Sequence, residues 1–206
     1  MTKIKICGIT NKADALAAAG LGVDMLGFVF YEKSKRYIEP LEAADIINEL
    51  PSGIARVGVF VDERPADVVK MAEDAFLDTL QFHGNETPEY CNAFKDKYKV
   101  IKAFRLKTRI DLKKVNGYDT DYYLFDAFRS DCVGGTGTSF DWSMLKDFEI
   151  LKPAILSGGL NCGNVERAIK EVLPFAVDVS SGVEGAPGKK DAELLKRFVE
   201  KVRKVG

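Results

Sequence analysis

The sequence predicts an α/β fold, a closed (β/α)8 barrel or TIM barrel, formed by a single domain over residues 1–206. Short apolar runs alternate with amphipathic segments along the whole chain, which is the pattern of strands alternating with helices. Strand–helix units of roughly 26 residues, eight in all, fill the chain, and eight such units suit this barrel. No linker rich in Pro, Gly or Ser divides the sequence, so we expect one domain.

The expected strands are short apolar segments, several of them rich in β-branched residues. Buried parallel strands are covered on both faces, so their apolar residues run on without alternation. The strands are predicted at residues 4–7, 25–30, 56–61, 79–82, 100–104, 122–125, 154–156 and 176–179.

Helices are expected between these strands because apolar residues there recur with helical spacing. Pro40 and Pro65 stand at plausible first helical positions, and Asn161 is a good N-cap residue. The helices are predicted at residues 11–19, 40–50, 65–76, 161–172 and from 191 onward, with weaker patterns at 86–97, 108–116 and 141–149.

An open, doubly wound sheet is the alternative topology for alternating strands and helices. Such a sheet would be expected to carry G-x-G-x-x-G after its first strand. Residues 7–11 read Cys-Gly-Ile-Thr-Asn instead, so the closed barrel is the preferred prediction.

The charge balance and the apolar runs limit the classes of partner. Thirty basic residues face 31 acidic ones, a net charge of -1, which lacks the basic footprint of a nucleic-acid-binding protein. No apolar run approaches the ~20 residues of a membrane span, and no signal peptide pattern opens the chain. We expect a cytoplasmic protein that binds a small anionic molecule, as a monomer or a homodimer.

The cysteines give no sign of a metal site or a disulfide framework. Cys7, Cys91, Cys132 and Cys162 lie far apart, and His83 is the single histidine. A zinc site would need clustered thiolates or imidazoles. We therefore expect reduced thiols, no metal and no cofactor.

Two glycine-containing segments predict a phosphate site. Gly158 and Gly159 follow the seventh predicted strand, and Ser180, Ser181 and Gly182 follow the eighth. Glycines let backbone N–H groups approach an anion, and the loops after these two strands often bind phosphate in this fold. The alternative is that the glycines only form turns. A third segment, residues 134–138, is either a plain loop or a lid that adds backbone donors.

Cys7 and Asp126 are the candidate catalytic pair. Each ends a predicted strand, and those strands lie three apart around an eight-stranded ring, so the side chains would face each other across its mouth. A thiolate base opposite a carboxylic acid suits a proton shuttle. The alternative for Cys7 is a small buried apolar residue.

Arg36 and His83 are candidate substrate contacts. Arg36 stands in a basic run, which forms either a solvated loop or, through the fork of the guanidinium, a clamp for a carboxylate. His83 ends the fourth predicted strand and is either a substrate contact or a histidine satisfied within the fold.

Taken together, these motifs resemble those of the phosphoribosylanthranilate isomerase family of tryptophan biosynthesis. The opening motif and the motif of the eighth strand are the most specific, whereas residues 105–120 match weakly. This chain departs from the family pattern at Cys162, where Pro is common, and at Phe82, where Leu is common. The matching segments, in family order, are residues 5–10, 27–30, 34–36, 56–61, 81–84, 134–137, 140–142, 157–160 and 178–184.

The resemblance implies a cofactor-free Amadori rearrangement of N-(5-phosphoribosyl)anthranilate. By that resemblance, Asp126 is the general acid that protonates the furanose oxygen, and Cys7 is the general base that removes the C2′ proton. Arg36 would hold the anthranilate carboxylate, and Asp178 would contact the sugar hydroxyls or order its loop. We expect the acid to be protonated, and the base to be a thiolate favoured by the positive ends of local dipoles.

Two other kinds of barrel protein would keep parts of this pattern. One is another phosphosugar enzyme: a histidine-pathway isomerase would carry a carboxylate where Cys7 stands, and an indole-forming lyase would need a catalytic lysine, for which Lys102 is a weak candidate. The other is a non-enzymatic phosphosugar-binding protein, which would be expected to lose Cys7 or Asp126. Both residues are present, which favours the enzyme.

Overall fold

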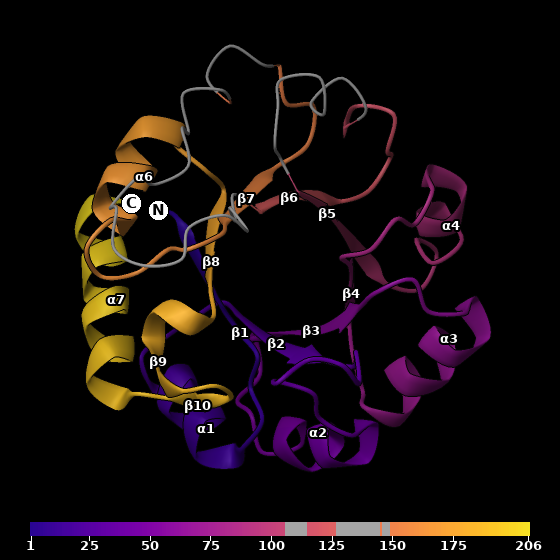
Figure 1. The fold of residues 1–206 in the computed structure, drawn as a ribbon, viewed down its shortest axis with the longest axis horizontal. Coiled ribbons are helices and arrows are strands. Elements are labelled where there is room, and N and C mark those ends of the chain that lie inside the picture. The colour runs from indigo at the N-terminus through magenta and orange to yellow at the C-terminus, as the bar shows by residue number, and fades with distance from the viewer. Residues whose placement is uncertain (106–114, 127–144, 146–148) are drawn as a thin grey trace.

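The eight strands form one closed parallel barrel in chain order, as the sequence predicts (Figure 1). The computed structural model describes residues 1–105, 115–126, 145 and 149–206. β1 closes the ring by pairing with β8, and Ile4 lies opposite Val177. The strands are β1 (Lys3–Cys7), β2 (Met25–Val29), β3 (Ala55–Phe60), β4 (Thr79–Phe82), β5 (Lys99–Arg105), β6 (Tyr122–Asp126), β7 (Ala154–Ser157) and β8 (Ala176–Val179).

The helices surround the barrel and cover its outer face (Figure 1). Asn11 caps the first helix through its side chain, which accepts a hydrogen bond from the Asp14 N–H, and Asp191 caps the last in the same way. The helices are α1 (Lys12–Gly20), α2 (Pro40–Ile47), α3 (Pro65–Asp74), α4 (Pro88–Asn92), α6 (Val165–Val172) and α7 (Ala192–Val205).

Five predicted segments differ from the structure or fall outside its described part. The helix predicted at 161–172 begins only at Val165, because the Asn161 side chain accepts a hydrogen bond from the Gly163 N–H at 2.7 Å and forms a turn. The helix predicted at 86–97 is reduced to α4. The segments 108–116 and 141–149 lie mostly, and the loop 134–138 wholly, outside the described residues.

A short hairpin follows β8 and was missing from the sequence prediction. The one-turn helix η2 (Ser181–Val183) leads into β9 (Glu184–Ala186), which pairs antiparallel with β10 (Lys189–Lys190). Pro187 and Gly188 form the turn between them and are the sequence signal that could have predicted it. Figure 1 shows this hairpin beside α1 and the end of β1.

The apolar core has two layers. The larger layer fills the space between the strands and the helices. A smaller, separate cluster fills the barrel toward the amino ends of its strands, and consists of Met25, Val57, Ile101, Ala103, Leu124, Ile155 and Ala176. A few further apolar side chains, those of Cys7, Val29 and Val59, lie nearer the carboxyl ends of the strands, where they line the candidate site together with polar groups.

Candidate active site

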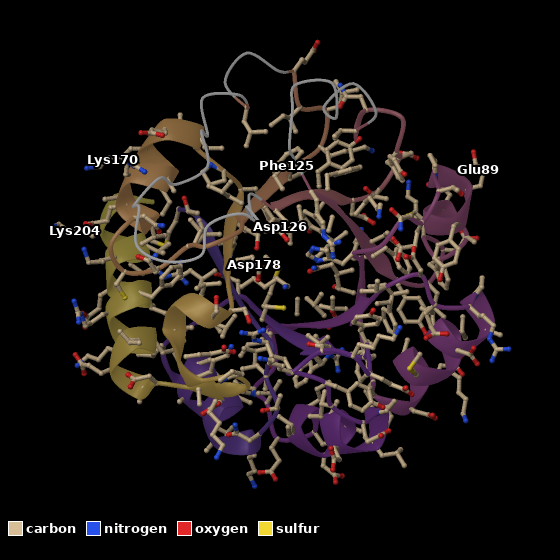
Figure 2. All side chains as sticks on the ribbon, viewed as in Figure 1. Glu89, Phe125, Asp126, Lys170, Asp178 and Lys204 are labelled. Carbon is tan, nitrogen blue, oxygen red and sulfur yellow. The ribbon has the colours of Figure 1, made fainter. Side chains whose placement is uncertain are left out.

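A cavity of about 300 Å³ opens at the carboxyl ends of the strands. Function collects at this end in (β/α)8 barrels. Figure 2 shows Asp126 and Asp178 toward the middle of the ring. Every predicted site residue except Gly182 lines the cavity, namely Cys7, Arg36, His83, Asp126, Gly158, Gly159, Asp178, Ser180 and Ser181.

Cys7 ends β1 with its side chain turned into the barrel and largely buried. Burial raises the pKa of its thiol, although the nearby ammonium groups of Lys5 and Lys190 oppose that rise. The sequence predicted a thiolate favoured by local dipoles. Removal from water outweighs the neighbouring positive charges, so the neutral thiol is the resting form at neutral pH.

Lys5 and Asp178 form an ion pair directly below Cys7. The Lys5 Nζ atom lies 2.9 Å from Asp178 Oδ1, and the Ser157 hydroxyl donates to Asp178 Oδ2 at 3.1 Å. Burial alone would lower the pKa of Lys5, but the negative charge of Asp178 and its hydrogen bond to Lys5 raise that pKa above its ordinary value. Asp178 therefore sits inside the cavity with one oxygen engaged by a buried cation.

Asp126 ends β6, and its carboxylate is held by a short chain of polar groups. The Nε2 atom of His83 lies 3.2 Å from Asp126 Oδ2, and the Gln81 side-chain amide nitrogen lies 3.0 Å from His83 Nδ1. In this orientation the Gln81 amide donates to Nδ1, which leaves Nε2–H to donate to the carboxylate. His83 thus contacts a predicted catalytic group.

A buried ion pair fixes the turn that carries His83. The Lys102 Nζ atom lies 2.7 Å from Glu86 Oε2 and donates to the Gly84 carbonyl at 2.8 Å. Glu86 in turn accepts hydrogen bonds from the backbone N–H groups of Asp62 and Gly84. Lys102 is committed to these contacts and does not line the cavity with Cys7, which argues against a lysine-dependent lyase.

Arg36 is oriented by Glu184 on the hairpin. Its Nε and Nη2 atoms donate to the two Glu184 oxygens at 2.8 and 2.6 Å, a two-pronged pair. Lys190 also bonds Glu184, at 2.9 Å, and donates to the Cys7 carbonyl at 2.6 Å. These contacts leave Nη1 and the outer edge of the Arg36 guanidinium free of Glu184, and that group lines the cavity.

The loops after β7 and β8 form one wall of the cavity. Gly158 and Gly159 have φ angles of 89° and 69°, a conformation that glycine adopts readily. The buried Ser180 hydroxyl has no hydrogen-bond partner among the described residues. Gly182 lies outside the cavity lining: a Cβ built there would meet the Leu160 carbonyl oxygen at 1.9 Å, so it permits the two loops to pack closely.

Sequence reasoning missed Lys5, Gln81, Glu184 and Lys190. Lys5 carried a usable signal, because a lysine between Ile4 and Ile6 in a strand covered on both faces must be paired. Lys190 stands in a charged run that is typical of an exposed loop, and only the hairpin turns it inward. Gln81 is nearly fully buried in β4, where strand composition alone does not mark it.

A second cavity, of about 600 Å³, lies at the amino ends of the strands. Its polar members are paired across neighbouring strands, as in Lys3–Asp24 at 2.7 Å and Arg56–Asp78 at 2.8 Å. These ion pairs join neighbouring strands at the amino ends of the barrel. We therefore assign the chemistry to the smaller cavity, at the carboxyl ends of the strands. Among the described residues, no three His, Cys, Asp or Glu side chains cluster as a metal site would require.

The fold and the cavity are those of a (β/α)8-barrel enzyme, with a thiol and a carboxyl beside two glycine-containing loops. Comparison with known proteins narrows this class. The model of the family described as N-(5'phosphoribosyl)anthranilate (PRA) isomerase matches residues 4–201. The chain belongs to this family.

Individual relatives match over the whole chain. The N-(5'-phosphoribosyl)anthranilate isomerase of Caldanaerobacter subterraneus subsp. tengcongensis is 49% identical and covers 100% of both chains. Two structures of the Thermotoga maritima phosphoribosyl anthranilate isomerase align over 99% of this chain and 100% of theirs. The first has a TM-score of 0.93 at 44% identity. The second, which is of monomers generated from the dimeric protein, has a TM-score of 0.87 at 42% identity.

A further structure of a phosphoribosyl anthranilate isomerase is in complex with reduced 1-(o-carboxyphenylamino)-1-deoxyribulose 5-phosphate. It is 42% identical, with a TM-score of 0.87 over 99% of this chain and 100% of that one.

Proposed function

We propose that this chain isomerises N-(5'-phosphoribosyl)anthranilate to 1-(2-carboxyphenylamino)-1-deoxyribulose 5-phosphate, with Cys7 and Asp126 as its base and acid. The chain is an isomerase of tryptophan biosynthesis by its family. The single observation that supports these two roles is the shared cavity. The Cys7 thiol and the Asp126 carboxyl, from β1 and β6, both line it beside the two glycine-containing loops.

The substrate carries two anionic groups, and the cavity has a candidate partner for each. The backbone of Gly158, Gly159 and Ser181, with the unpartnered hydroxyl of Ser180, would bind the phosphate. The outer edge of the Arg36 guanidinium would bind the anthranilate carboxylate, because Glu184 already holds its inner edge. Gly182 would contribute through loop packing.

The reaction then requires proton transfers at the ring oxygen, at C2′ and at C1′ of the sugar. Asp126 gives its proton to the ring oxygen, the bond from that oxygen to C1′ breaks, and a Schiff base forms between C1′ and the anthranilate nitrogen. The Cys7 thiolate removes the proton from C2′, which yields an enolamine. The enolamine then tautomerises to the ketone, because the C2′ hydroxyl loses its proton as C1′ gains one. Asp178 would contact the sugar hydroxyls, and His83 would hold the Asp126 carboxyl.

Loss of the fluorescence of freshly prepared phosphoribosylanthranilate tests the activity. Adding the protein without metal or cofactor should accelerate this loss far beyond the spontaneous rate. An unchanged decay with folded protein would overturn the proposed reaction. The alternative of a non-enzymatic phosphosugar-binding protein would give binding of the substrate with no acceleration.

We further propose a cytoplasmic protein with no nucleic-acid or membrane partner, present as a monomer or a homodimer. The net charge of -1 supports the first part. No helix among the described residues is long and apolar enough to cross a bilayer. Cell fractionation tests the location, and light scattering of the purified chain decides between the two oligomeric states.

A further inference from the structure

A fully buried lysine lies directly beside the sulfur of the proposed base. Lys5 and Cys7 are two residues apart on β1, so both side chains point into the barrel. A Cβ built on Gly27 of the neighbouring strand would lie 2.9 Å from Cys7 Sγ and 3.1 Å from Lys5 Nζ. The sulfur and the ammonium therefore both border the space that Gly27 leaves open, and they lie close to each other.

Pairing with Asp178 alone does not explain why a lysine stands at this position. Burying an ammonium is costly even when it is paired, and an apolar residue often replaces a buried ion pair without loss of stability. The barrel layer just below is built from apolar residues such as Val57 and Leu124. The Lys5 ammonium has three N–H donors, and one of them serves Asp178 at 2.9 Å. A second donor is available to the Cys7 sulfur.

We propose that Lys5 is a positioning residue for the reaction, whose buried ammonium stabilises the thiolate form of Cys7 while Asp178 holds that ammonium in place. The inference rests on the proposed function, because that function makes the Cys7 thiolate the general base of the reaction. Lys5 does not line the cavity, so it would act through the base and not on the substrate. Charge attraction at this short range, away from water, is strong enough to shift the balance between thiol and thiolate.

Other charged groups also surround Cys7, and they act differently. Lys190 on β10 contacts the Cys7 backbone carbonyl at 2.6 Å, and its positive charge acts in the same direction as that of Lys5. Asp178 on β8 opposes the thiolate. The remaining titratable groups are His83 and Asp126, which line the same cavity, and Arg36 and Glu184 on the Cys7 side, where Glu184 is paired with both Arg36 and Lys190.

The titration of Cys7 by iodoacetamide tests the proposal without measuring activity. The rate of alkylation is followed against pH in a protein whose Cys91, Cys132 and Cys162 are replaced by Ala. Lys5→Met should move the midpoint of the curve to higher pH and slow alkylation at a fixed neutral pH about tenfold. Asp178→Asn should move the midpoint in the opposite direction, because it removes a negative charge from beside the sulfur.

Lys3→Met is the matched control on the same strand. Lys3 is half exposed and pairs with Asp24 at the other end of the barrel, so its loss should leave the alkylation curve unchanged. If Lys5→Met, folded by circular dichroism, reacts like the parent protein at every pH, Lys5 only neutralises Asp178 and the proposal is wrong.

A double variant keeps the test decisive if Lys5→Met fails to fold. Lys5→Met with Asp178→Asn buries no unpaired charge, and its thiol should titrate at higher pH than that of Asp178→Asn alone. Equal midpoints would refute the role of Lys5. The proposed function fails separately, if Cys7→Ser retains normal turnover, and that result would leave the titration of the thiol unaffected.

Discussion

Two sides of the cavity hold their proposed catalytic groups in different surroundings. On the base side, formed by Lys5, Cys7, Asp178 and Lys190, the thiol is packed among buried charges of both signs. On the acid side, formed by Gln81, His83 and Asp126, the carboxyl accepts a hydrogen bond from an imidazole that an amide orients.

The difference follows from what each group must do. A buried thiol resists ionisation, so its side of the cavity needs cations nearby for a thiolate to form at all. A carboxyl that must donate a proton needs orientation toward the ring oxygen, and an imidazole contact supplies orientation. The comparison indicates that the residues around Cys7 influence the charge state of its thiol, whereas the residues around Asp126 set the orientation of its carboxyl.

The largest expected effect is from breaking the base side. Cys7→Ser keeps size and fold but replaces the thiol by a hydroxyl that does not ionise near neutrality. We expect kcat to fall by ~10²–10⁴ or more, with little change in substrate binding. Fluorescence assays and isothermal titration with a product analogue measure the two quantities. Near-normal kcat would remove Cys7 from the mechanism, and Cys162→Ser is the control that should stay active.

Breaking the acid side should have an effect of about the same size. Asp126→Asn preserves shape and hydrogen bonding but has no proton to give to the ring oxygen, so kcat should fall by ~10²–10³ while the melting temperature changes little. A variant with normal kcat, or with lost stability and no other defect, would mean that Asp126 is structural.

The pH profile of the same variant sharpens the comparison. Because the pKa of Cys7 is raised above its ordinary value, the thiol is expected to titrate above the carboxyl, and the active pair is then a minor protonation state. The alkaline limb of kcat/KM in the parent protein then reports the thiol. In Asp126→Asn only the thiolate is needed, so residual kcat/KM should rise toward the thiol pKa and then stay level over the pH range where the parent declines. A decline in both would contradict the assignment.

A smaller effect is expected at the edge of the cavity. Arg36→Met should raise KM mainly, by roughly 10- to 100-fold, because a carboxylate is bound alike in substrate and transition state. Steady-state kinetics separate KM from kcat.

Inorganic phosphate should compete with substrate in the parent and in this variant. If saturating phosphate leaves the rate unchanged, the loops after β7 and β8 do not bind the phosphate group.

The smallest effect is expected far from both sides. Asp119 lies on the surface before β6, and hydrogen bonds from Lys152 and Lys95 lower its pKa to about 2. Its folded pKa is depressed, so its contribution to stability is present above the unfolded pKa and is lost as pH falls through about 2. Asp119→Asn should therefore lower the melting temperature slightly at pH 6 and not at pH 2. An equal difference at both pH values would exclude this charge effect.

Most of the candidate site could be predicted from the residues at the carboxyl ends of the expected strands. The apolar runs place Cys7 and Asp126 at the ends of β1 and β6, and the barrel rule then brings those ends together. The same reasoning found the glycine loops. The same reasoning failed where a residue acts through a partner far along the chain. Glu184 contacts Arg36, and Lys190 contacts Cys7, only once the barrel has closed. No local sequence pattern predicts such long-range contacts.

The Lys190 contact also has a consequence for how the protein is made. Its ammonium joins the Cys7 carbonyl to the Ser180 carbonyl, across the seam where β1 meets β8. Cys7 and Lys190 are 183 residues apart, so a nascent chain can hold all eight barrel strands and still lack this contact. This contact to the proposed base therefore forms only after all eight barrel strands have been synthesised, so assembly of the barrel precedes catalysis.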